Sequence, residues 1–323
     1  MKNKSTQAGL TLIETMIALS IGVFLSAGVL QIFITSNQSY KMQENLSRLQ
    51  ENGRFAMALI SNNIRMAGFI GCNGAATTTN NLNSPTSFLY NFATAIQGFE
   101  ATSTTAWSPA IDTAITSPLG GSDIISIRRA DDKSFTVTAH STVSANITLD
   151  TTATADNLNT AGVKSCSTTV VSDCTSADFF QVTAISGSDL SHSSSGCTPA
   201  NLVATLSKTY VGGQVYAINT ISFYVGTNPS SQPSLYRRVG VNSAEELVEG
   251  IESMQILYGV DNDTIAGANY YVTADLVNNW SKVVSIRVTL TVRTIDANLT
   301  SATSDGRIRR VFTSTITLRN RLV

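Results

Sequence analysis

The chain begins with a change from polar to apolar residues that is sharp enough to predict a membrane segment. Residues 10–34 are almost wholly apolar, and Glu14 is the only charged residue among them. About 20 consecutive apolar residues cross a bilayer as a helix, so this run is long enough. Lys2 and Lys4 precede the run, and the next positive charge is Lys41. Because positive residues favour the cytoplasmic side, we expect a single-pass segment with a cytoplasmic N-terminus.

A second hydrophobic pattern follows this run and has the period of a helix. Its apolar positions recur at intervals of three, four or seven: Met42, Leu46, Leu49, Ala56, Ile60 and Ile64. This spacing predicts an amphipathic helix. No proline occurs before Pro85, so we expect one helix from Leu10 to about Met66. Its first half must lie in lipid or among similar helices, and its second half packs on a globular domain.

After Cys72 the helical pattern ends and short β-type runs begin. Residues 73–120 are rich in Thr, Asn, Ser and Gly and predict long loops with one short element. Strands are expected at five runs of β-branched and aromatic residues: Ile124–Ala130, Phe135–Ala139, Phe179–Ile185, Gln214–Val225 and Leu235–Val239. Residues 228–233 predict a turn, and Ala244–Gly250 favours a helical turn.

The strongest strand pattern lies near the C-terminus. From Ser285 to Arg293 apolar and polar residues alternate strictly, as a half-buried antiparallel strand requires. Phe312, Ile316 and Leu318 continue the pattern in Arg310–Arg319, after a turn signal at residues 305–306. The predicted fold class is therefore α+β: a long N-terminal α-helix packed on an antiparallel β-sheet, with loop-rich insertions.

The composition is that of an exported, β-rich protein. Charged residues make up 13% of the 323 residues, about half of the usual quarter. Uncharged Ser, Thr and Asn take their place. The formal net charge is −1, so the electrostatic footprint of a nucleic-acid-binding protein is missing and no nucleic acid partner is predicted.

Four cysteines predict two disulfides in an exported protein: Cys72, Cys166, Cys174 and Cys197. Three pairings are possible, and the spacing does not choose among them. In one of them Cys166 and Cys174 close a short loop, and Cys72 meets Cys197. The alternative is buried free thiols. Metal binding is disfavoured because there is no C-x-x-C, and no metal or other cofactor is predicted.

Catalytic signatures are missing, so the chain is not expected to be an enzyme. No phosphate-binding loop, zinc-protease motif or nucleophile elbow occurs in the sequence. The two histidines, His140 and His192, lie among Ser and Thr and are expected to be solvated surface groups. Residues 261–263 (Asp-Asn-Asp) offer oxygen ligands for calcium, but the EF-hand glycine and final glutamate are missing, so a loop role is favoured.

A modest group of arginines occurs at the C-terminal end of the chain: Arg309, Arg310, Arg319 and Arg321. A DNA-binding role is one interpretation. Charged residues that alternate with hydrophobic ones are also what protects the exposed edge of a β-sheet. The solvent face of an edge strand is therefore the simpler interpretation.

An ordinary membrane anchor does not account for Glu14. A carboxylate in the bilayer costs a few kcal/mol and marks a functional site by default. One competing interpretation is a secretory signal cleaved near Gly28, but the apolar run continues through Ile34. Another is a plain single-span anchor, which accounts for the hydrophobicity and leaves Glu14 without a role.

The stretch from Gly9 to Glu14 (Gly-Leu-Thr-Leu-Ile-Glu), followed by the apolar run, resembles the class III signal of type IV pilins and pseudopilins. The resemblance implies cleavage by prepilin peptidase after Gly9 and N-methylation of the new amine at Leu10. Phenylalanine is usual at this position, so Leu10 is a departure. In this family the acidic residue, here Glu14, neutralises the amine of a neighbouring subunit in the apolar filament core. An ammonium partner offsets the cost of burying a carboxylate.

Further segments resemble the PilW family of minor pilins. They lie at both ends of the chain: 49–56, 65–72, 247–252, 255–261, 309–312 and 318–322. The resemblance implies a leader at 1–9, a transmembrane or filament-core half-helix at 10–34, an amphipathic half-helix at 35–70 and a β-rich periplasmic or extracellular domain at 71–323. The protein would lie in the inner membrane before assembly and then at the pilus or cell surface.

The resemblance implies a structural role in priming or capping type IV pilus assembly, with support for twitching motility and adhesion. The implied partners are other minor pilins, the major pilin, a PilY-type tip adhesin and prepilin peptidase. Two alternatives remain open at this point. One is a pseudopilin of a type II secretion system, and the other, from a different class, is a single-span periplasmic receptor or enzyme.

Overall fold

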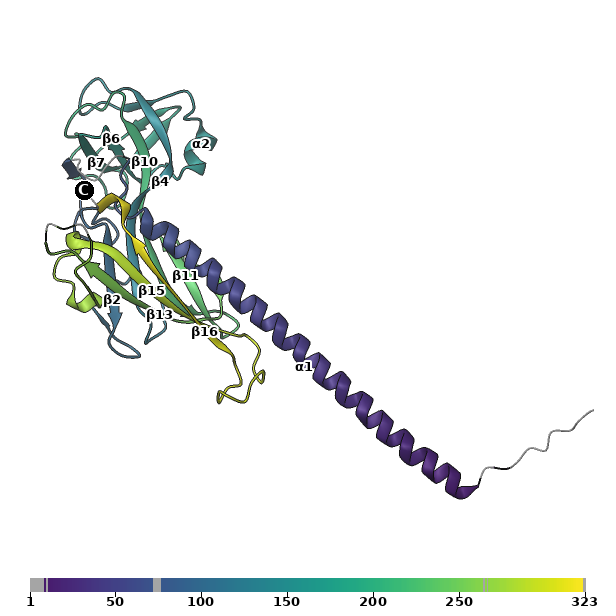
Figure 1. Ribbon diagram of the computed structural model, residues 1–323. Coiled ribbons are helices and arrows are strands. Elements are labelled where there is room, and N and C mark those ends of the chain that lie inside the picture. Colours follow the sequence, from purple (N-terminus) through teal and green to yellow (C-terminus); the bar gives the residue numbers. More distant parts are fainter. Residues whose placement is uncertain (1–8, 10, 72–76, 264, 266, 322–323) are drawn as a thin grey trace, which may run out of the picture. The chain divides into compact units, whose positions relative to one another are not determined.

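The computed structural model describes residues 9, 11–71, 77–263, 265 and 267–321 (Figure 1). The chain divides into two compact units. The first consists of Met1–Leu49 with Thr294–Ile308, and the second of Gln50–Arg293 with Arg309–Val323. Each unit is described by itself. Met1–Leu49 supplies most of the long helix, and the second unit contains all of the strands.

The long helix α1 spans Leu12–Arg65 and has 54 residues, which confirms the single helix expected from the sequence. Residues 11–43 are exposed throughout. Further along the helix, the Asn45 amide donates to Lys41 O and to an Asp296 carboxylate oxygen, both at 2.9 Å. Asp296 belongs to the loop Thr294–Ile308, in which the Arg307 guanidinium donates to the carbonyls of Thr294 and Ile295. These bonds give the first unit its internal structure.

The last part of α1 packs within the second unit. Ala56, Ile60 and Ile64 are fully buried, so the amphipathic half behaves as the periodicity predicts. Gly53 lies directly on the Phe312 ring, where an added Cβ would be 2.3 Å from a ring carbon. This close approach explains why glycine occurs inside a helix that it otherwise weakens. A hydrogen bond of 2.9 Å from Gly68 N to Arg128 O fixes the segment after the helix.

The larger sheet has 12 strands among the described residues, and its long central pair is β4 (Ile124–Ala139) and β10 (Gln214–Thr227). Its main path runs β1-β7-β6-β10-β4-β5-β9-β8. On this path β1 is Thr77–Asn80, β5 Ile147–Leu149, β6 Thr168–Ser172, β7 Ser176–Gln181, β8 Ala184–Ser186 and β9 Asp189–Ser191. Off this path, β11 (Pro233–Val239) pairs with β10, and β12 (Glu245–Glu249) pairs with β11. Likewise β2 (Ile96–Ala101) pairs with β4, and β3 (Trp107–Ser108) pairs with β2. One short helix, α2, spans Ala155–Thr160.

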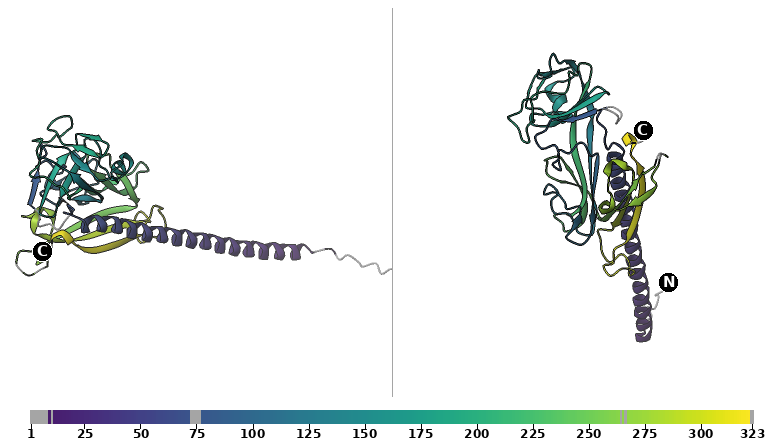
Figure 2. Two further views of the ribbon diagram at one scale, coloured as in Figure 1. Left: turned by 90° about the horizontal axis from the view of Figure 1, so that it is seen from above. Right: turned by 90° about the vertical axis from the view of Figure 1, so that its left-hand side faces the viewer.

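The smaller sheet has four strands in the order β14-β13-β15-β16. Its strands are β13 (Ile251–Val260), β14 (Tyr270–Val272), β15 (Val283–Arg293) and β16 (Arg309–Thr317), with 3₁₀ turns at Ala274–Leu276, Trp280–Lys282 and Arg319–Arg321. The alternation predicted for Ser285–Arg293 is confirmed, because Ile286, Val288, Leu290 and Val292 are all fully buried. Figure 2 shows this sheet beside the C-terminal end of α1, in agreement with the Gly53–Phe312 contact.

Several local predictions were wrong, and in each case pairing overrode local preference. Within Ala244–Gly250, residues Glu245–Glu249 form strand β12 instead of a helical turn, because they pair with β11 and place Glu245 against Arg237. The two runs expected at Ile124–Ala130 and Phe135–Ala139 are one strand, β4. Of the residues 73–120, the described ones (77–120) contain three short strands instead of one element. The pairing is antiparallel except between β1 and β7, which are parallel.

The histidines also differ from expectation, since both are buried. His140 is 2% exposed and His192 is 4% exposed, and their rings meet edge to face with centroids 6.1 Å apart. Tyr210 N donates to His140 Nδ1 at 3.1 Å, and His192 Nε2 bonds to Ala145 O at 2.8 Å. Burial lowers the pKa of His140, and the neighbouring His192 lowers it further. The pair therefore belongs to the interior around β4, β7 and β10, where burial favours the neutral form of His140.

Ser122 and Asp123, which precede β4, join the two sheets. The Asp123 carboxylate accepts hydrogen bonds from Ala101 N at 3.0 Å and from Ile256 N at 2.8 Å, one on each sheet. Asp123 N donates to Met254 O at 2.8 Å, and Met254 N donates to Ser122 Oγ at 3.0 Å. Asp123 is 2% exposed, and burial raises its pKa against the opposing effect of the two amides. A buried carboxylate is tolerated here because both of its oxygens are bonded.

Glu100 lies beside this junction, and of the carboxyl groups there it has the most strongly raised pKa. Burial, followed by the charges of Asp123 and Asp275, raises the pKa of Glu100 to about 7. One Glu100 carboxyl oxygen, Oε2, and the fully buried Tyr258 hydroxyl have no hydrogen-bond partner within the described part of the chain. The site therefore favours a neutral, protonated Glu100.

We predict that Glu100→Gln gains stability relative to the unmodified protein as the pH rises from about 5 to about 8. The folded state holds the Glu100 proton up to about pH 7, whereas the unfolded state releases it near 4.5. The stabilising contribution is therefore complete below about pH 4.5 and is lost as the pH rises through about 7. Glutamine stays neutral throughout, and the difference should be on the order of 1 kcal/mol after solvent screening.

The measurement is urea unfolding of both proteins at the two pH values, followed by tryptophan fluorescence. Trp107 donates to Ser122 O at 2.9 Å, and the Trp280 ring meets Tyr258 edge to face, so both tryptophans report on this junction. All other titratable groups are the same in both proteins, so their contributions cancel in the comparison. A stability difference that does not change with pH would contradict the prediction.

Candidate assembly site on the N-terminal helix

Glu14 lies in the first turn of α1 and takes part in its N-terminal cap. Thr11 precedes the first helical residue, Leu12, and Glu14 follows three positions later, which is the spacing of a capping box. Glu14 N bonds to Thr11 Oγ1 at 3.4 Å, and Thr11 N donates back to Glu14 Oε2 at 3.5 Å. The Thr11 hydroxyl also donates to Glu14 Oε2, at 3.4 Å. The sequence contains the capping signal as Thr-x-x-Glu, although the cap was not predicted from it.

The cap satisfies backbone donors without compensating the charge of Glu14. All three contacts are long, and Glu14 is exposed. In the described part of the chain no cationic group lies within ion-pair distance of its carboxylate. An apolar environment would therefore leave this charge uncompensated unless an outside cation were present. Gly9 and Thr11 are described on either side of the predicted cleavage point, while Leu10 lies outside the described residues.

The helix surface around Glu14 is apolar and uncovered. Its large hydrophobic side chains are mostly more than half exposed: Leu12, Ile13, Met16, Ile17, Leu19, Ile21, Val23, Phe24, Leu25, Val29, Leu30, Ile32, Phe33 and Ile34. By length and composition this part of α1 can cross a membrane. An apolar surface of this extent in water is unfavourable. Lipid or a bundle of like helices removes that cost, so the first half of α1 is an association surface.

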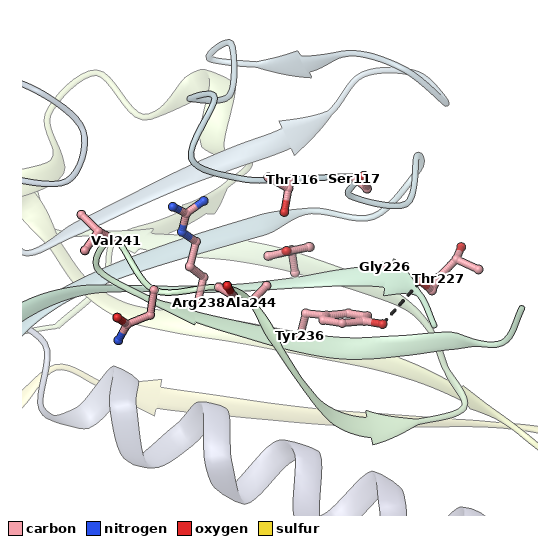
Figure 3. Close-up of a pocket in the computed structure, with 11 residues that line it drawn as sticks. Thr116, Ser117, Gly226, Thr227, Tyr236, Arg238, Val241 and Ala244 are labelled. Carbon is pink, nitrogen blue, oxygen red and sulfur yellow. Dashed lines mark hydrogen bonds between the residues drawn. The ribbon is translucent and has the colours of Figure 1, made fainter. Parts of the chain in front are cut away.

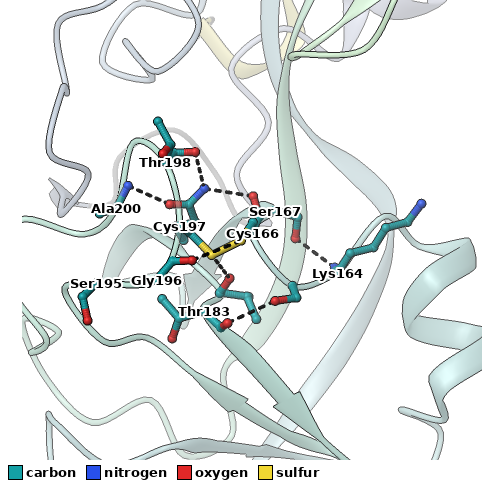
Figure 4. The surroundings of a disulfide bond; sticks show 12 residues. Lys164, Cys166, Ser167, Thr183, Ser195, Gly196, Cys197, Thr198 and Ala200 are labelled. Atoms are coloured by element: carbon teal, nitrogen blue, oxygen red, sulfur yellow. Dashed lines mark hydrogen bonds between the residues drawn. A yellow bond between two sulfur atoms is a disulfide. The ribbon is translucent and has the colours of Figure 1, made fainter.

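A disulfide lies within the second unit, outside the long helix. Cys166 is bonded to Cys197, which excludes the pairing that closes a short loop between Cys166 and Cys174. Cys174 is also in a disulfide, and Cys72 lies outside the described residues. Figure 4 shows the bond between Cys166 and Cys197. The Gln181 amide donates to Cys166 O and to Thr198 O, both at 2.9 Å. The bond thus fastens the segment after β9 to the start of β6.

Removing this disulfide as Cys166→Ser with Cys197→Ser should lower the free energy of unfolding by roughly 3–4 kcal/mol, because the bond closes a loop with a sequence separation of 31. Urea unfolding of the double variant measures the loss. The single variant Cys166→Ser, compared after blocking the remaining thiol, distinguishes loss of the bond from thiol exchange. Equal midpoints for the double variant and the unmodified protein would contradict this contribution.

The C-terminal arginines do not form one basic patch. Strand β16 lies at the edge of its sheet, but Arg319 and Arg321 belong to the 3₁₀ turn after it, so the edge-strand interpretation holds for Arg310 and not for the whole group. Arg309 binds the Glu252 carboxylate through two nitrogens, at 2.6 and 2.8 Å, and Arg293 approaches the same carboxylate at 3.4 Å. Arg310 and Arg319 are exposed, and the side chain of Arg321 lies outside what is described. Arg309 is therefore used inside the fold.

Residues 261–263 form a loop held by its own hydrogen bonds. Asp261 Oδ1 accepts from Asp263 N at 3.2 Å, and Asp263 Oδ2 accepts from the Asn269 amide at 2.7 Å. Asn262 N donates to Asn269 Oδ1 at 2.6 Å. These contacts are typical of an Asx-type loop. Over the residues that the structure describes, no group of three or more His, Cys, Asp or Glu side chains has the geometry to hold a metal ion.

Two protein families match the chain, one at each end. The prokaryotic N-terminal methylation motif matches residues 4–30, which include the predicted cleavage point, Glu14 and most of the apolar run. The family described as Type IV Pilus-assembly protein W matches residues 222–320, which include β11 and β12 and the whole smaller sheet. No curated protein and no solved structure matches the chain.

These matches agree with the geometry of the site. A methylation motif at the start of an exposed apolar helix supports membrane anchoring before assembly into a pilus. Both families are pilin families, which points to a structural protein and not to an enzyme. The α+β fold, with its long N-terminal helix, agrees with this assignment. The two matches together support a type IV pilin of the PilW type.

Proposed function

We propose that this protein is a minor pilin that primes or caps the assembly of type IV pili and so supports twitching motility and adhesion. The observation that carries the proposal is the uncovered apolar half of α1, which holds a single carboxylate, Glu14, three residues beyond Thr11. Such a surface is costly in a lone subunit and favourable in a helical bundle. The match to the pilus-assembly family over residues 222–320 favours the pilus over other filaments that use the same signal.

Maturation follows from the N-terminal segment. Prepilin peptidase cleaves between Gly9 and Leu10, and the new Leu10 amine is N-methylated. Before assembly, residues 10–34 span the inner membrane with the N-terminus in the cytoplasm, as the position of the lysines favours. Residues 35–70 continue the helix, and residues 71–323 form the periplasmic domain. After assembly that domain lies at the pilus or cell surface.

Assembly joins the subunit to its partners through two kinds of contact. The apolar half of α1 packs among the helices of other minor pilins and of the major pilin, where Glu14 meets the N-terminal amine of a neighbour. The β-rich domain contacts further minor pilins and a PilY-type tip adhesin. The first contact is hydrophobic and general, so the second must provide the specificity of position.

Deletion of the gene tests the pilus role. We expect loss of surface pili and of twitching motility, and both should be restored by the unmodified gene supplied in trans. Protein secretion through the outer membrane should continue in the deletion strain. A strain with normal pili and motility but blocked secretion would show a type II secretion pseudopilin instead. Normal pili, motility and secretion together would contradict any role in filament assembly.

A further inference from the structure

A cavity of about 490 Å³ lies on one face of strands β10 and β11. Figure 3 shows it between the loop that carries Thr116 and Ser117 and the turn that carries Val241 and Ala244. Its volume is within the range of about 300–1,000 Å³ that is usual for small-molecule sites. Nothing in the pilin function described above requires a cavity at this place.

The walls of this cavity are fixed by the backbone of the sheet. On one side Leu119 N donates to Val225 O at 2.7 Å, which holds the 116–119 loop on β10. On the other side Gly240 N donates to Thr220 O at 2.8 Å, which holds the turn after β11. Gly226 keeps the space open, because an added Cβ would lie 3.0 Å from the Tyr236 ring. The cavity is therefore preformed, which lowers the entropic cost of binding.

Two tyrosines give the cavity a flat aromatic surface. Tyr224 and Tyr236 are neighbours across β10 and β11, and their rings are stacked with centroids 5.9 Å apart and planes inclined by 17°. Tyr224 is buried and Tyr236 is partly exposed, and both line the cavity. Flat, rigid aromatic groups offer contact area at a small entropic cost. The C–H face of a sugar ring is a surface that packs well against such a platform.

The polar side chains around the two tyrosines are hydrogen-bond donors and hydroxyls that are largely unpaired within the described part of the chain. Arg238 Nε donates to Gly240 O at 3.2 Å, and within the described residues its terminal nitrogens have no hydrogen-bond partner. The lining hydroxyls and amide also lack side-chain hydrogen bonds to described residues: Thr116, Ser117, Thr227, Asn242 and Ser243. The lining contains no carboxylate. Glu246 lies close enough to raise the pKa of Tyr236 after burial, but its carboxylate accepts from Asn228 at 2.9 Å.

We propose that this cavity binds an acidic saccharide, a sugar ring that carries a carboxylate. The Arg238 guanidinium receives the carboxylate, since charge-assisted bonds of this kind are the strongest available in the cavity. The partly exposed Tyr236 ring, stacked on the buried Tyr224, receives the apolar face of the sugar ring, and the free hydroxyls and the Asn242 amide receive its hydroxyl groups. A single guanidinium with no helix N-terminus in the lining is a poor site for a di- or triphosphate. Saccharide binding adds recognition to a structural subunit and does not depend on its place in the filament.

The test uses the full-length protein in detergent micelles and saturation-transfer difference NMR. The probes are methyl β-D-glucuronide and methyl β-D-glucoside, which share a ring and differ in the carboxylate. We expect saturable binding of the glucuronide, with affinity about tenfold higher than that of the glucoside. Sodium acetate serves as a carboxylate without a ring and should not displace the glucuronide at equal concentration.

Three variants locate the binding. Arg238→Gln should lower glucuronide affinity to that of the glucoside, and Tyr236→Leu should weaken both sugars at least tenfold. Arg237→Gln is the matched control: Arg237 is adjacent but points to the opposite face of β11, where it pairs with Glu245, so binding should be unchanged. Tryptophan fluorescence confirms that each variant is folded. No saturable glucuronide binding, equal binding by Arg238→Gln, or displacement by acetate would each overturn the proposal.

Discussion

Replacing Glu14 with alanine should leave the subunit processed and membrane-inserted but should abolish its assembly into pili. Removing a carboxylate makes the apolar half of α1 easier to insert, so the membrane step is not impaired. In the filament core, however, the amine of a neighbouring subunit would lose its partner and stay buried as an unpaired charge. Removing one partner of a buried pair costs about 3–5 kcal/mol, enough to reduce assembly by orders of magnitude. Surface piliation, measured by shearing and immunoblotting with the wild-type copy absent, gives the result.

The capping contact offers a control that separates two roles of Glu14. Thr11→Val removes the hydroxyl that bonds to Glu14 and keeps the carboxylate. Loss of a cap costs about 1 kcal/mol, so this variant should assemble nearly as well as the unmodified protein. If Thr11→Val and Glu14→Ala were equally defective, helix capping would explain the requirement. Normal piliation by Glu14→Ala would remove the pairing role altogether.

Replacing Asp123 with alanine should destabilise the β-rich unit more than any other single change at the junction of the sheets. The substitution leaves the amides of Ala101 and Ile256 buried without an acceptor. Each unsatisfied buried amide costs about 1–3 kcal/mol, so the loss should be about 2–5 kcal/mol in the free energy of unfolding. Urea unfolding at neutral pH, followed by the fluorescence of Trp107 and Trp280, measures it.

Asp123→Asn is the matched variant at this position. Asparagine has nearly the same shape and keeps one oxygen acceptor, but its NH₂ group faces the second amide donor. Its stability should therefore lie between those of the alanine variant and the unmodified protein. Because asparagine carries no charge, it also avoids the desolvation that raises the pKa of Asp123. Three equal stabilities would show that the carboxylate does not join the sheets.

The elements predicted best from the sequence were those with a strong local period. The helix and strand β15 each bury one face, and residues such as Ile60 and Val288 mark that face without reference to the rest of the chain. Strand β12 was missed because Ala-Glu-Glu-Leu prefers a helix locally, and only its pairing with β11 makes it a strand. The histidines were misplaced for a similar reason. Their polar sequence neighbours do not show that His140 and His192 meet in the interior.

The functional residues also divide into those that a local sequence pattern predicts and those that only the folded structure brings together. Glu14 was identified because a lone carboxylate in an apolar run is visible in the sequence, whereas its cap with Thr11 was not predicted, although the spacing of three residues indicates it. The partner of Cys166 was not predictable, because it depends on which segments the folded sheet brings together. The cavity beside Tyr236 is likewise built from segments more than 100 positions apart in the sequence, of which none carries a motif.

The most direct test of the filament account is the mass of the N-terminal peptide of the mature protein. Purified from cells with active prepilin peptidase, the chain should begin at Leu10, and its N-terminal peptide should carry the added mass of one methyl group. That result supplies the amine that Glu14 of a neighbouring subunit requires. A mature chain that still begins at Met1, or one cut near Val29, would have no such amine at the start of α1 and would contradict assembly through this helix.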